Sequence, residues 1–150
     1  MRLTIPLGAV SIALALACGG GSSSIGSGVD DFHATVDMPG QVSNGETFDL
    51  VVTVFNTAPQ EQTLYSLDLA DEFMAGTDVV GSDPPYLSTM HVPIDNTESY
   101  EYMKPIPSGG STTVTLTMLA TDAGSWAGEV DVCVDGNARY NSYMMSTTVQ

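Results

Sequence analysis

Apolar and polar residues alternate over most of the chain, and this pattern limits the fold more than any other feature. The clearest run is Thr47–Asn56, in which Phe48, Leu50, Val52 and Val54 occupy every second position. Successive side chains of a β-strand point to opposite faces of a sheet, so a period of two predicts a strand with one buried face. We find no convincing amphipathic helix. The chain is therefore expected to be all-β.

Turn signals containing Gly, Pro or Asn separate the alternating segments. The segments expected to form strands are 31–38, 47–56, 63–69, 77–81, 99–103, 112–120, 126–134 and 140–149, and 77–81 is the weakest of them. Asp71–Ala75 is expected to form a single helical turn. Ser82–Asn96 is rich in proline and is expected to be a long surface loop. About seven or eight short strands favour two packed antiparallel sheets.

The first residues form a separate unit. Arg2 precedes an apolar stretch from Ile5 to Leu16, and small residues follow, which is the order of parts in a secretion signal. The stretch is shorter than the ~20 apolar residues of a transmembrane helix. We expect residues 1–17 to be removed on export.

The end of this signal, Leu14-Ala15-Leu16-Ala17-Cys18, resembles the bacterial lipoprotein signal. The resemblance implies diacylglycerol on the Cys18 thiol, cleavage before Cys18 and acylation of the new amino group by a fatty acid such as palmitate. More than one acyl chain holds a protein firmly on a membrane. The expected location is the cell envelope, and Gly19 in place of Asp favours the outer membrane where one exists. The alternative is an ordinary cleaved signal with an incidental cysteine.

Two units follow the signal. Residues 18–28 are the cysteine and a Gly/Ser-rich tether that is too poor in apolar residues to fold. Residues 29–150 have the usual length of one domain.

Acidic side chains dominate this domain. All 18 Asp and Glu residues follow the signal and are opposed by Lys104 and Arg139 alone, so the net charge is −16. Nucleic acids and anionic lipids need clusters of Lys or Arg, which excludes both as partners of the domain surface. A basic protein partner or a cation fits this charge, and a merely solvated surface is the alternative.

One stretch, Thr121–Val130, resembles the corner before a central strand of immunoglobulin-like domains, where Asp-Ala-Gly precedes an aromatic residue, here Trp126. Val42–Phe48, Val52–Thr57 and Ile106–Ser111 resemble turns and strand ends of bacterial surface-repeat domains of immunoglobulin type. The resemblance implies an immunoglobulin-like β-sandwich without the usual cysteine pair. It also implies a module for interaction, adhesion or structure, with no catalytic residues to carry over.

The expected 82–96 loop holds the best candidate for binding a protein partner. Tyr86, Leu87 and Met90 place large apolar side chains on a segment that should be exposed. The alternative is that these side chains fold back over one end of the sandwich. The sequence has no nucleophile elbow, phosphate loop or zinc-protease helix, so we expect a non-enzymatic protein.

Binding of a metal, calcium first and copper second, is the alternative function. Acidic residues such as Asp68 and Asp71 lie close in sequence but do not form a calcium loop. A copper site would combine Cys133 with His33, His91 and the methionines Met90, Met144 and Met145, yet no His follows the cysteine as in cupredoxins. We therefore assign no metal ligand, cofactor or catalytic residue.

Cys133 is out of phase with Val130, Val132 and Val134, which places it on the outer face of its strand. Neighbouring carboxylates should raise the pKa of its thiol and weaken it as a nucleophile. We expect a partly covered structural cysteine. A reactive thiol, or one that pairs with another protein's cysteine, is the alternative.

Overall fold

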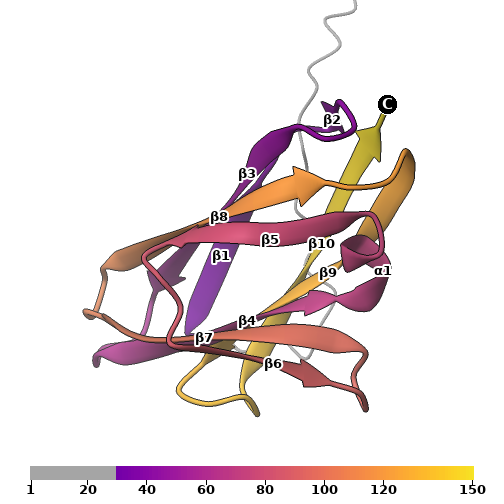
Figure 1. Ribbon diagram of the computed structural model, residues 1–150. Coiled ribbons are helices and arrows are strands. Elements are labelled where there is room, and N and C mark those ends of the chain that lie inside the picture. Colours follow the sequence, from indigo (N-terminus) through magenta and orange to yellow (C-terminus); the bar gives the residue numbers. More distant parts are fainter. Residues whose placement is uncertain (1–29) are drawn as a thin grey trace, which may run out of the picture.

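Two β-sheets pack face to face in the computed structural model, which describes residues 30–150 (Figure 1). The elements are β1 (Phe32–Asp37), β2 (Gln41–Val42), β3 (Thr47–Asn56), β4 (Gln62–Ala70), α1 (Asp71–Met74), β5 (Thr77–Asp83), β6 (Ser88–Val92), β7 (Thr97–Ile106), β8 (Ser111–Ala120), β9 (Gly124–Val134) and β10 (Tyr140–Val149). The expected signal 1–17, the lipidation site Cys18 and the 18–28 tether lie outside the described residues. No helix within 30–150 is long and apolar enough for a membrane crossing.

The strand order is β1-β3-β8-β5 in one sheet and β2-β10-β9-β4-β7-β6 in the other. All pairs are antiparallel except the short pair of β2 with β10. The protein is thus an immunoglobulin-like β-sandwich, and the expected fold class is confirmed. Residues 30–150 contain ten strands rather than seven or eight, because β2 and β6 were not expected as strands.

The core forms where the apolar faces of the two sheets meet. Alternate residues of β3, β8 and β9 point inward and are buried, as their period of two predicts: Phe48, Leu50, Val52, Val54, Val114, Leu116, Met118, Val130, Val132 and Val134. Full burial of each such side chain contributes about 1.5–3 kcal/mol to folding. α1 is the expected helical turn, and its Phe73 is completely buried.

The prediction of a loop over Ser82–Asn96 is wrong at its start, where Ser82 and Asp83 belong to β5, and in its middle part. Ser88–Val92 forms β6, which pairs in regular register with Thr97–Glu101 of β7. β6 is an edge strand with almost no buried side chain, so it lacks the alternation that marks a half-buried strand. The strand is identified by its backbone pairing with β7, which the sequence pattern does not report.

β7 also extends further than expected, through Pro105 to Ile106. Pro105 pairs with Thr63 of β4. The Thr63 N–H donates to the Asp135 carboxylate and the Thr63 carbonyl accepts from the Asp135 N–H, so both groups point toward the β9 side and away from β7. The nitrogen of Pro105 therefore faces the other edge of β7, which β6 covers only as far as Glu101. Proline costs no ladder hydrogen bond at such a position.

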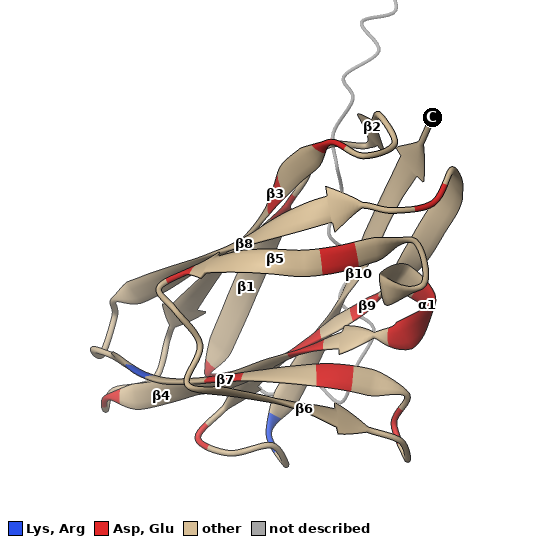
Figure 2. Cartoon of the chain, in the orientation of Figure 1, with Lys and Arg blue, Asp and Glu red and all other residues tan. Residues whose placement is uncertain are grey.

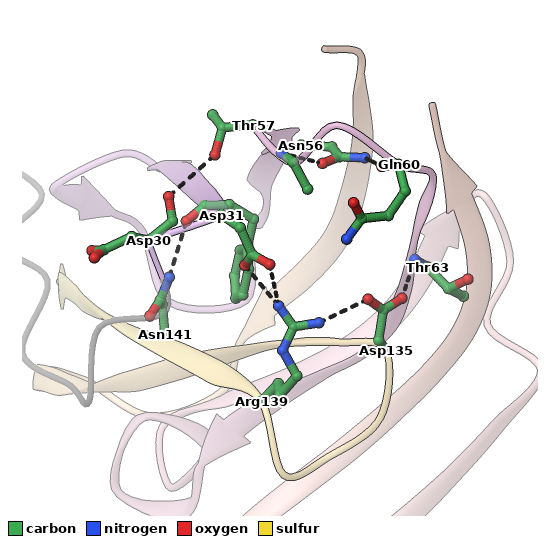
Figure 3. A network of polar contacts seen from close by, with 11 residues as sticks. Asp30, Asp31, Asn56, Thr57, Gln60, Thr63, Asp135, Arg139 and Asn141 are labelled. Carbon is green, nitrogen blue, oxygen red and sulfur yellow. Dashed lines mark hydrogen bonds and ion pairs between the residues drawn. The ribbon is translucent and has the colours of Figure 1, made fainter. Parts of the chain in front are cut away.

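A charged clasp joins the two sheets at one end of the sandwich (Figure 3). The Arg139 guanidinium donates to both carboxylate oxygens of Asp31, at 2.6 and 2.7 Å, and to Asp135 at 2.8 Å. Asp31 immediately precedes β1, whereas Arg139 lies in the β9–β10 hairpin. Asp135 also accepts a hydrogen bond from the Thr63 backbone N–H at 2.7 Å. The clasp therefore fixes the hairpin against β1 and β4.

Replacement of Arg139 with methionine is expected to lower the free energy of unfolding by about 1 kcal/mol at low salt. The change leaves Asp31 and Asp135 without their shared cation, and a side-chain exposure of 35% limits the loss. Urea denaturation measures the difference. Lys104→Met is the control, because it removes the same charge from an exposed side chain. Equal losses in both variants would show that Arg139 acts only through net charge.

Candidate functional site

A row of directly paired residues crosses five strands of the six-stranded sheet. The row consists of Met90 on β6, Ser99 on β7, Asp68 on β4, Asp131 on β9 and Ser142 on β10. Along β4 and β9 these residues alternate with buried core residues, so they lie on the outer face of the sheet. Two carboxylates are thus directly opposite each other, an arrangement that costs energy in a sheet.

Serine hydroxyls, not cations, hydrogen-bond to these two carboxylates. Ser99 donates to Asp68 and Ser142 donates to Asp131, both at 2.5 Å. Burial raises the pKa of Asp131, the hydrogen bond from Ser142 opposes this, and nearby carboxylates including Glu129 and Asp68 add to the rise. A cationic side chain placed beside this pair would lower its electrostatic energy.

Cys133 lies two residues after Asp131 on the outer face of β9, opposite Ser66 of β4. Its side chain is only 2% exposed, and its Sγ–H points to Asp68 Oδ2 at 3.5 Å. Burial and then the Asp68 charge raise the pKa of the thiol to about 12. The outer-face position and the direction of the pKa shift are confirmed, although burial contributes more than the carboxylates. The thiol is covered more completely than expected and is a poor nucleophile at neutral pH.

Asp68, Asp131 and Cys133 help to line a cavity of about 490 Å³ on the outer face, here called the acidic trough. Its carboxylates are Asp68, Asp95, Glu101 and Asp131, and no Lys or Arg is among its described lining residues. Apolar surface comes from Met90 and Val92 on β6 and from Tyr140 on β10. The trough therefore combines negative charge with an apolar rim.

The candidate partner-binding residues lie beside the trough on one segment. Met90 belongs to β6 and is 64% exposed, and Leu87, in the connection before β6, is 68% exposed. Tyr86 is 37% exposed and packs edge-to-face on Tyr100 at 5.3 Å, so it folds back in part. Ile94, which the sequence analysis did not select, is 87% exposed. The segment 86–94 thus exposes four large apolar side chains; Met90 lines the trough, and Tyr86 and Leu87 do not.

The residues considered for copper do not come together. His33 stacks on Phe55 in the four-stranded sheet, whereas His91 lies on β6, 3.7 Å from both Asp71 and Glu98. Met145 is in the core. Across residues 30–150 no three His, Cys, Asp or Glu side chains form a group suited to a metal ion.

The trough was not predicted from the sequence, although β4 and β9 each carry part of the signal. Asp68, Asp131 and Cys133 each lie between two apolar residues, which marks an outward face, whereas Ser99 lies between Glu98 and Tyr100. Their convergence depends on the strand order β9-β4-β7, which joins distant parts of the chain.

Comparison with known proteins supports the fold. No family model matches the chain, and no curated protein matches it in sequence. A domain of Escherichia coli alpha-2-macroglobulin superposes with a TM-score of 0.51 and 16% identity, covering 80% of this chain and 7% of that one. A cohesin module from a Clostridium perfringens family 33 glycoside hydrolase gives a TM-score of 0.49 and 9% identity, covering 79% and 96%. At such identities the likeness to the macroglobulin domain shows a shared β-sandwich.

Proposed function

We propose that the chain is a lipid-anchored, non-enzymatic module of the bacterial cell envelope that binds a protein partner through segment 86–94 and the adjoining trough. Adhesion and a structural role are forms of the same activity. The anchor is Cys18, on the strength of the lipoprotein-like sequence that precedes it. The outer membrane is the favoured location where the cell has one.

The observation that carries the proposal is the exposure of Leu87, Met90 and Ile94, which lie on or beside the edge strand β6. Each is more than 60% exposed, and they lie within eight residues of one another. Apolar side chains concentrated in one place, rather than scattered singly, are typical of interaction sites. The acidic side chains around them supply a polar, negatively charged rim.

Cross-linking in native cells tests the proposal. A photo-reactive amino acid replaces Leu87, and the control replaces Val80 on β5, which is also apolar and 54% exposed but lies on the other sheet. We expect one reproducible protein adduct from position 87 and none from position 80. The absence of an adduct, with the protein retained in the membrane fraction, would contradict the proposal.

Membrane anchoring has its own test. Cys18→Ser removes the thiol that would carry diacylglycerol, so we expect the variant protein to lose its acyl mass and to leave the membrane fraction or stay unprocessed. Cys133→Ser is the matched control and should change neither property. A wild-type protein with an unmodified Cys18 would contradict the anchoring.

A further inference from the structure

We propose that the free edge of β6 takes up an extended, basic segment of the partner as an additional β-strand. This inference rests on the proposed interaction module and adds to it the binding mode and the chemistry of the partner. Strand addition uses backbone hydrogen bonds for affinity and alternate side chains for specificity.

Within residues 30–150, no strand pairs with the outer edge of β6. β6 is the last strand of its sheet, and the Glu101 carbonyl of β7 faces it, accepting a hydrogen bond from the Leu87 N–H at 2.7 Å. Backbone direction alternates along an antiparallel ladder, so Ser88, Met90 and Val92 face β7. The N–H and C=O groups of Thr89 and His91 therefore point away from the sheet.

The other edge strands of the described sheets, β1, β5 and β2, are less suited to strand addition. On β1, the Ala34 N–H donates to the Tyr143 hydroxyl at 2.7 Å and the Phe32 carbonyl accepts from Asn141 at 3.2 Å. β5 has an irregular register at Val80, and β2 is only two residues long. Bulges and short strands are common protections against edge pairing. β6 instead has five residues in unbroken register, which suits it to strand addition.

Charge identifies the chemistry of the added strand. β6 contains no Asp, Glu, Lys or Arg, but acidic residues lie on β7 beside it (Figure 2). Glu101 accepts from Ser88 and Glu98 accepts from Thr89, each at 2.6 Å. These two carboxylates belong to opposite faces of the sheet, because they are three positions apart along β7. Lys or Arg side chains on either face of an added strand would therefore meet a carboxylate.

The same charge argues against a second copy of this chain as the occupant. Pairing two β6 edges would bring two sets of flanking carboxylates together, on domains that each carry a net charge of −16. Like charges across a contact cost affinity. Met90, with Leu87 and Ile94 at either end of β6, would instead cover the apolar side chains of the incoming strand.

A synthetic peptide of alternating lysine and valine is the probe, added to the purified full-length protein. We expect saturable binding that weakens as salt is raised and that slows hydrogen exchange at the Thr89 and His91 amides. His91→Pro removes one outward N–H without breaking the β6–β7 ladder and should weaken binding about tenfold or more. His91→Ala keeps that N–H and should bind like the wild type.

Peptide variants keep the test independent of how the proline variant folds. A peptide with methyl groups on alternate backbone nitrogens has lost the N–H donors along one of its edges. When that edge faces β6, the peptide should not bind. Replacement of the lysines with glutamate should also abolish binding. Equal binding of the methylated and unmethylated peptides in every register, or no slowing of exchange at β6, would overturn the inference.

The outcomes separate this inference from the proposed function. An adduct at position 87 without peptide-dependent protection of β6 would leave the interaction module standing and reject strand addition. A wild-type dimer that His91→Pro converts to a monomer would identify a second copy as the occupant and would also reject the inference. Loss of both the adduct and the protection would reject both proposals.

Discussion

Replacement of Gly76 with alanine is expected to destabilise the protein by about 3 kcal/mol or more. A Cβ atom at this position would lie 2.0 Å from Trp126 Cε2 and 2.1 Å from Trp126 Nε1. The indole cannot easily move away, because its Nε1–H donates to the Asp122 carbonyl at 2.8 Å and its ring packs against the core. The added methyl group must therefore displace the Trp126 side chain or the backbone between α1 and β5.

Gly40→Ala is the matched control, since a Cβ there would meet no atom within 4 Å. We expect that variant to be neutral or slightly stabilised, because alanine restricts the unfolded chain. Urea denaturation of both variants gives the comparison. A loss for Gly76→Ala within 0.5 kcal/mol of the control, about the size of an ordinary surface effect, would contradict the tight packing of Trp126.

The strands that could be predicted from the sequence are those with one buried face. β3 and β10 have the expected bounds to the residue, because each presents alternate side chains to the core. Trp126 is in phase with the inward valines of β9 and packs against the core. Local periodicity suffices wherever burial alternates along the chain.

β6 and the acidic trough could not be predicted in this way. β6 is exposed on both faces, so its strand conformation depends on backbone pairing with β7. The trough depends on register: Asp68 lies opposite Asp131 only because β4 and β9 are neighbours. The alternation of residues along a strand shows which side chains point outward, but it does not show which residues of other strands lie beside them. The exposure of Leu87 and Met90 was expected from their surroundings in the chain, and their role in binding stays a prediction.

The free energy of unfolding is expected to fall as the pH rises above about 9, and Cys133 should account for much of the fall. The ordinary pKa of a cysteine thiol is close to 9, and burial followed by the Asp68 charge raises the pKa of Cys133 to about 12. Below pH 9 both states keep the proton, so the thiol has no effect on stability. Between pH 9 and 12 the unfolded state loses the proton and the folded state keeps it, which favours unfolding.

Buried tyrosines add to this trend at higher pH. Burial raises the pKa of Tyr102 to about 12, against a hydrogen bond from Ser82, and burial also raises the pKa of Tyr100 and Tyr143. Their ordinary pKa is 10.0, so their contribution begins one unit above that of the thiol. At pH 10 each of these tyrosines is already half ionised in the unfolded state, so the share of Cys133 must be isolated by a variant that lacks the thiol.

Cys133→Ser separates the thiol from the other groups, because serine keeps a hydrogen-bond donor for Asp68 and does not titrate in this range. Between pH 8 and pH 10 we expect the wild type to lose about 1 kcal/mol more than Cys133→Ser, whatever their difference at pH 8. Urea denaturation at the two pH values gives both losses. Equal losses in the two proteins would show that the thiol ionises as readily in the folded state as in the unfolded state. That result would contradict the burial of Cys133 beneath the trough.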